Sequence, residues 1–234
     1  MRYVVSCYEQ GLAQNGMKNV GEPIVKICGL STRESVDAAI AAGAQWIGLV
    51  SFEPSPRHVE LEQATTLADH ARGRAKIVSL TVNADDDRLA AIVEHVRPDL
   101  LQFHGSETPE RIAEIKARFG LPVMKAVGVS ELADLEKIDP YIGAADHILL
   151  DAKPPKGAIL PGGNGAAFDW GILDHFDKQT PFMLSGGLNP QNVHEAVTKV
   201  HPFGVDVSSG VERSPGVKDL RKIADFAKAA RAAH

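Results

Sequence analysis

The chain has few cysteines, few aromatic residues and no long apolar run. Its 234 residues include 2 cysteines, and aromatic residues make up 6% of them. With so few thiols and no signal peptide visible after Met1, we expect a cytoplasmic protein with reduced cysteines rather than a disulfide framework. The apolar runs are far shorter than the roughly 20 residues that cross a bilayer, which argues against a membrane protein.

An excess of positive charge is also lacking, because 25 Lys and Arg stand against 30 Asp and Glu, for a net charge of −5. No electrostatic attraction to nucleic acid or to an anionic membrane surface is therefore expected. The nine histidines show no HExxH motif and no close paired spacing, so no metal site is expected. The remaining composition, with 44% hydrophobic and 24% charged residues, is typical of a globular protein.

Short Val/Ile/Leu-rich runs alternate along the chain with longer segments of helical period, and turn residues separate them. The expected strands are Ile24–Cys28, Trp46–Phe52, Lys76–Val82, Leu100–His104, Val123–Val127, His147–Asp151, Phe182–Ser185 and Gly204–Val207. The expected helices lie near Arg33–Ala42, Leu61–Arg72, Asp86–Val96, Pro109–Phe119, Glu131–Ile138, Pro190–Val200 and Val217–Ala230, with a short turn near Asp169–Leu173 after the sixth strand.

This alternation predicts an α/β fold of parallel βαβ units, which can close as a doubly wound sheet or as a barrel. Eight repeats in this length favour a (β/α)8 TIM barrel. Residues 1–22 do not fit the repeat. We therefore expect a single barrel domain over residues 23–234, preceded by an N-terminal extension.

Polar residues gather at the carboxyl ends of the expected strands, where the active sites of such barrels lie. Lys26 and Cys28 are two residues apart on the first strand and so share a face. Arg57 follows the second strand in the turn "PSPRH", and Asp151 ends the sixth strand. A nearby cation favours the thiolate, so Lys26 is placed to make Cys28 a base, while a carboxyl group in a partly dry mouth can act as a general acid. The alternatives are a small buried hydrophobic role for Cys28 and a cap role for Asp151.

The last two strands run into "LSGGLNP" and "VSSGVE", which leave backbone N–H groups unobstructed beside serine hydroxyls. Loops after the seventh and eighth strands of such barrels often hold phosphate. Each loop alone could equally be a tight turn that needs glycine for its backbone conformation. Because the two loops lie on adjacent strands, their pairing favours a phosphate site.

The motifs "KICGL", "PSPRHV", "LQFHG", "LLDAK", "PGGNGAAFDW", "LSGGLNPQNV" and "GVDVSSGVERSPGVKD" together resemble those of the phosphoribosylanthranilate isomerases of tryptophan biosynthesis. The resemblance runs from about Ile24 to Ala230. It implies a (β/α)8 barrel that converts a phosphoribosyl-anthranilate aminoaldose to the aminoketose by general acid and base catalysis. It implies no cofactor, a small-molecule phosphosugar-anthranilate ligand, and a monomer or homodimer.

The resemblance also implies roles for individual residues of this sequence. Cys28 would be the general base and Asp151 the general acid, and Arg57 would hold the anthranilate carboxylate. The remaining candidate contacts are Lys26 and His104, Gly163 and Gly165 in the loop Gly162–Gly165, Gly186 and Gly187, the inward-facing Asp206, and Ser208, Ser209 and Gly210. A structural role is an equal alternative for His104.

Two other functions remain open from the sequence. The sister isomerase of histidine biosynthesis, or an isomerase of dual substrate, would run the same chemistry on a bulkier substrate. Such enzymes typically carry an aspartate where Cys28 stands, so the thiol argues against them. The other alternative is a non-catalytic barrel that binds a sugar phosphate, and the pairing of Cys28 with Asp151 argues against it because binding alone needs neither group.

Overall fold

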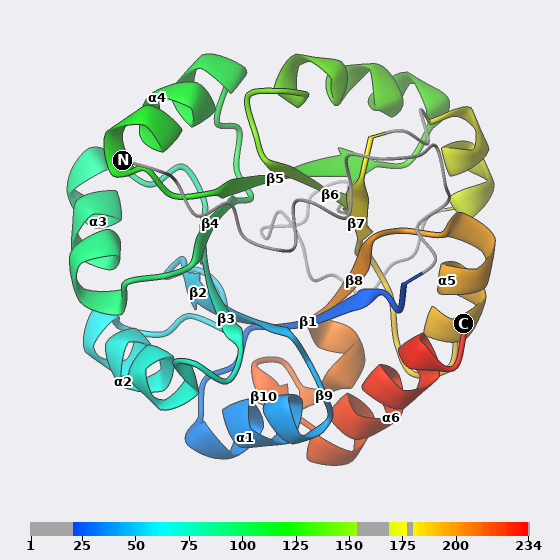
Figure 1. The fold of residues 1–234 in the computed structure, drawn as a ribbon, viewed down its shortest axis with the longest axis horizontal. Coiled ribbons are helices and arrows are strands. Elements are labelled where there is room, and N and C mark those ends of the chain that lie inside the picture. Colours follow the sequence, from blue (N-terminus) through cyan, green and yellow to red (C-terminus); the bar gives the residue numbers. More distant parts are fainter. Residues whose placement is uncertain (1–20, 154–168, 177–179, 234) are drawn as a thin grey trace, which may run out of the picture.

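The computed structural model describes residues 21–153, 169–176 and 180–233, and there it contains a closed parallel barrel with the strand order β1-β2-β3-β4-β5-β6-β7-β8 (Figure 1). The strands are β1 (Ile24–Cys28), β2 (Trp46–Ser51), β3 (Lys76–Thr81), β4 (Leu100–Phe103), β5 (Val123–Val129), β6 (His147–Ala152), β7 (Phe182–Leu184) and β8 (Gly204–Val207). The predicted (β/α)8 barrel is confirmed.

Helices surround the ring of strands in Figure 1. The α-helices are α1 (Arg33–Ala41), α2 (Leu61–Ala71), α3 (Asp86–Ala91), α4 (Pro109–Phe119), α5 (Val193–Val200) and α6 (Leu220–Arg231). Shorter segments are the π-helix η2 (Ile92–Val96) and the 3-10 helices η3 (Leu132–Lys137), η4 (Asp139–Tyr141), η5 (Trp170–His175) and η6 (Ser209–Val211). No helix within these described ranges combines the length and apolar character needed to cross a bilayer.

Several predicted helices differ from the structure. The segment Asp86–Val96 divides into α3 and the π-helix η2, and the helix expected from Pro190 begins at Val193. The segment Glu131–Ile138 forms the 3-10 helix η3, because the Asp134 carboxylate accepts the backbone N–H groups of Ser130 and Glu131 and holds a tight turn. The last helix begins at Leu220 rather than at Val217, since β9 (Glu212–Ser214) and β10 (Val217–Lys218) form an antiparallel pair before it.

The barrel carries two layers of apolar packing. One layer fills the space between the strands and the helices, and the other fills the barrel interior through Trp46, Val78, Leu100, Met124, Ala126, Leu149 and Met183. Side chains alternate between these layers along each strand. Buried polar groups such as Lys26, Gln102 and Asp206 lie nearer the carboxyl ends, together with a small apolar cluster of Cys28, Val50 and Leu80.

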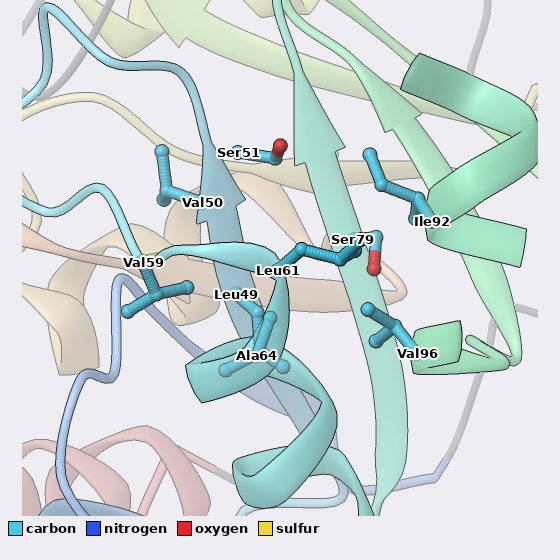
Figure 2. Close-up of a pocket in the computed structure, with 9 residues that line it drawn as sticks. All are labelled: Leu49, Val50, Ser51, Val59, Leu61, Ala64, Ser79, Ile92 and Val96. Atoms are coloured by element: carbon cyan, nitrogen blue, oxygen red, sulfur yellow. The ribbon is translucent and has the colours of Figure 1, made fainter. Parts of the chain in front are cut away.

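An apolar crevice lies between the barrel wall and its helices, where side chains of β2 and β3 approach α2 and η2 (Figure 2). Leu49, Leu61 and Val96 are among the residues that line it. None of the predicted catalytic or binding residues lines this crevice, so the polar groups at the strand ends define a separate site.

Candidate active site

Cys28 ends β1 inside the barrel, with 3% of its surface exposed. It packs with Val50 and Leu80 in a small apolar cluster. Gly48 on the neighbouring strand makes this possible, because an added Cβ there would lie 2.7 Å from the Cys28 Sγ. Ser208 donates its hydroxyl to the Cys28 carbonyl oxygen at 3.1 Å, which joins the ends of β1 and β8. The thiol thus faces the mouth from a fixed position.

Lys26 is fully buried, and its Nζ lies 2.8 Å from the Asp206 Oδ1. Burial alone would lower the pKa of Lys26, but Asp206 and Cys28 raise it, so the lysine stays charged. Burial also raises the pKa of the Cys28 thiol, and the opposing attraction of Lys26 does not overcome it. This direction runs against the expectation that Lys26 holds a preformed thiolate in the free protein. Burial is the main reason, and the negative charge of Asp206 adds to it by disfavouring the thiolate.

Asp151 lies on β6 with 5% of its surface exposed. Its Oδ2 is 3.1 Å from the His104 Nε2, and the His104 Nδ1 is 3.3 Å from the Gln102 Nε2. Gln102 and Asp151 thus contact opposite ring nitrogens of His104. The structure brings His104 within hydrogen-bond distance of the proposed acid.

Arg57 is buried, and its Nε and Nη2 donate to the two carboxylate oxygens of Glu212 at 2.8 and 3.0 Å. Its side chain crosses Gly29, where an added Cβ would lie 2.8 Å from the Arg57 Cδ. Lys218 reaches the same carboxylate at 2.8 Å and also donates to the Ser208 carbonyl oxygen at 2.9 Å. Arg57 and the loop after β8 are thus joined by charged groups of the β9–β10 pair.

The two glycine loops pack against each other and against β6. A Cβ on Gly210 would lie 1.9 Å from the Leu188 carbonyl oxygen, and one on Gly186 would lie 2.2 Å from the Ala152 N. Gly186 and Gly187 also adopt left-handed φ angles of 85° and 66°. Ser209 begins η6, which is a single turn, so the N–H groups of these loops matter more than a helix dipole. Predicted contacts Gly163 and Gly165 lie outside the described residues.

Sequence reasoning missed Glu212, Lys218 and Gln102. All three belong to motifs that it had singled out, "GVERSPGVKD" and "LQFHG". The missing signal is pairing across the fold, because Glu212 meets Arg57 over a separation of 155 residues. A carboxylate three residues after the serine pair of "SSG" was the available hint.

Comparison with known proteins decides the family. A family model described as N-(5'-phosphoribosyl)anthranilate (PRA) isomerase matches residues 25–229. The chain belongs to the phosphoribosylanthranilate isomerase family. Relatives of that name include one from Agrobacterium fabrum, 56% identical over 88% of this chain and 93% of its own length, and one from Rhodopseudomonas palustris, 58% identical over 89% and 95%.

Solved structures of phosphoribosylanthranilate isomerases have the same fold. The crystal structure from Thermotoga maritima covers 90% of this chain and 99% of its own, with 36% identity and a TM-score of 0.80. Another, in complex with reduced 1-(o-carboxyphenylamino)-1-deoxyribulose 5-phosphate, has 34% identity and a TM-score of 0.76 over 90% of this chain and 99% of its own. The resemblance seen in the motifs is confirmed at the level of the family.

Proposed function

We propose that the chain catalyses the Amadori rearrangement of N-(5'-phosphoribosyl)anthranilate to 1-(2-carboxyphenylamino)-1-deoxyribulose 5-phosphate, with Cys28 as general base and Asp151 as general acid. The observation that carries the proposal is the order of the strands around the ring. Cys28 on β1 and Asp151 on β6 flank β7 and β8, whose glycine loops suit a phosphate. An acid and a base thus lie on opposite sides of a phosphosugar bound at those loops.

The remaining groups suit the aromatic half of the substrate. Val50 and Leu80 form an apolar cluster with Cys28, and the partly buried Phe52 and Val82 extend it. This surface fits the anthranilate ring, and Arg57 lies beyond Gly29 to receive the ring carboxylate. Bidentate contact with a carboxylate is what a guanidinium does best.

The reaction needs two proton transfers by the protein. Asp151 gives a proton to the furanose ring oxygen, which opens the sugar to an imine. Cys28 then removes the proton from C2, which the imine has acidified, and the resulting enamine tautomerises to the ketone. No electrons leave the substrate, so the chemistry calls for no redox cofactor. Burial raises the pKa of the Cys28 thiol in the free protein, which disfavours the thiolate that this step requires.

The proposal includes the setting in which the enzyme works. Residues 23–234 would form the catalytic barrel and residues 1–22 an N-terminal extension, of which residues 1–20 lie outside the described residues. We propose a cytoplasmic enzyme that acts as a monomer or homodimer on this small molecule alone. A Thermotoga maritima relative is described as dimeric.

The direct test is to mix the protein with freshly generated phosphoribosylanthranilate and to follow the loss of anthranilate fluorescence. Turnover that saturates with substrate, and a product with the mass of the starting material, are expected. Absence of turnover by a folded preparation would refute the proposed reaction. A histidine-pathway aminoaldose, supplied in parallel, should not be converted.

A further inference from the structure

The short hairpin formed by β9 and β10 packs directly on the loop that carries Arg57. Gly216, between the two strands, has a φ of 80°, and an added Cβ there would lie 2.2 Å from the Pro56 carbonyl oxygen. Only glycine permits this approach. The turn of the hairpin therefore packs closely against Pro56, the residue next to Arg57.

Glu212, the first residue of the hairpin, is the centre of the contact. It is 8% exposed, and its carboxylate accepts the Arg57 Nε at 2.8 Å, the Arg57 Nη2 at 3.0 Å, and the Gly216 backbone N–H at 3.3 Å. Lys218, on the returning strand, donates to the same carboxylate at 2.8 Å. Burial raises the pKa of Glu212, but Arg57 and Lys218 outweigh burial and hold that pKa below its usual range. Glu212 is thus a charged residue at neutral pH.

This geometry constrains the guanidinium. An arginine side chain has several rotatable bonds and loses much rotamer freedom when it is fixed. A two-point contact through Nε and Nη2 defines both the position and the plane of the guanidinium. A fixed guanidinium loses less freedom when it takes up a second carboxylate, so fixing it in advance strengthens substrate capture.

We propose that Glu212 is the positioning residue for Arg57, and that the β9–β10 hairpin serves to hold Glu212 in place for this purpose. The proposal rests on the proposed function, in which Arg57 receives the anthranilate carboxylate. In this proposal Glu212 acts on the substrate only through Arg57, to which its carboxylate is bound. Its removal should therefore weaken substrate capture more than the chemical step.

The test measures KM and kcat for Glu212→Gln in the wild-type protein and in an Arg57→Ala background. In the wild-type background KM should rise about tenfold, as expected for the loss of a charge-assisted contact, while kcat changes less than about threefold. In the Arg57→Ala background the same substitution should change KM less than about twofold, because the residue through which Glu212 acts is gone.

Glu60→Gln is the matched control, because Glu60 is an exposed carboxylate of the same region that pairs with His58 and not with Arg57. It should leave KM unchanged. Glu212→Asp covers the case in which Glu212→Gln fails to fold, since it keeps the charge but shortens its reach, and it should also raise KM only when Arg57 is present. An equal rise of KM in both backgrounds, with wild-type turnover intact, would overturn the positioning role. Failure of the wild-type protein to turn over would instead overturn the proposed function.

Discussion

Replacing Gly210 by alanine tests whether the loop after β8 holds the phosphate of the substrate. The added Cβ would lie 1.9 Å from the Leu188 carbonyl oxygen, whereas real Cβ contacts do not fall below 3.0 Å. The loops after β7 and β8 must therefore separate by about 1 Å. A misplacement of about 1 Å at a positioning contact can cost about 10²-fold in rate, or about 2.7 kcal/mol of transition-state stabilisation. We expect kcat/KM of Gly210→Ala to fall by about that factor.

The assay is steady-state loss of anthranilate fluorescence, together with the inhibition constant for inorganic phosphate. In Gly210→Ala, kcat/KM should fall and the inhibition constant for phosphate should rise, because the strain acts on the groups that would bind phosphate. Gly21→Ala is the control, since its Cβ would meet nothing within 4 Å and its φ, like that of Gly210, is not left-handed. A Gly210→Ala protein with a normal melting profile and kcat/KM within twofold of wild type would refute the phosphate assignment for this loop.

Three further predictions concern single side chains. Cys28→Ser and Asp151→Asn should each lower kcat by about 10²–10⁴-fold with the fold retained, and near-normal kcat in either variant would remove that residue from the chemistry. Ultraviolet titration of the free protein, with Cys28→Ser as the blank for Cys7, should place the Cys28 midpoint above that of a free thiol, and Lys26→Met should move it higher still because a cation that favours the thiolate is lost. Burial lowers the pKa of His147. Below a pH of about 6.5 the unfolded chain therefore binds a proton at His147 more readily than the folded chain does, and the free energy of unfolding should fall as pH decreases. Chemical denaturation of His147→Phe across that window should show a smaller pH dependence, and an identical slope would contradict the assignment.

The barrel and much of its mouth could be read from the sequence because both follow from local rules. A period of two residues placed Lys26 and Cys28 on one face of the first strand, and the alternation of strand and helix predicted the closed ring. The expected thiolate took no account of burial, which is the largest influence on the pKa of Cys28, or of a long-range contact of Lys26. Its partner Asp206 lies 180 residues away, so no local pattern could show that the lysine was already engaged.

The same limit applies to the hairpin of β9 and β10. Strands of three and two residues are too short to show any alternation, and Val217 and Lys218 were instead read as the start of the last helix. The hairpin is stabilised by Glu212, whose carboxylate forms ion pairs with both Arg57 and Lys218. Tertiary contacts decide the conformation of such a segment.

The pairing of β1 with β8 has a consequence for the order of events during folding. The first and last strands meet through four registered pairs, and the buried Lys26–Asp206 ion pair lies at this seam. Until β8 arrives, β1 has an open edge and Lys26 has no carboxylate to face from β8. Closing a loop of this length is entropically slow, and contacts of high sequence separation form late. Completion of the mouth around Cys28 and closure of the ring are therefore one event, so enzymatic activity should return during refolding only with the last strand.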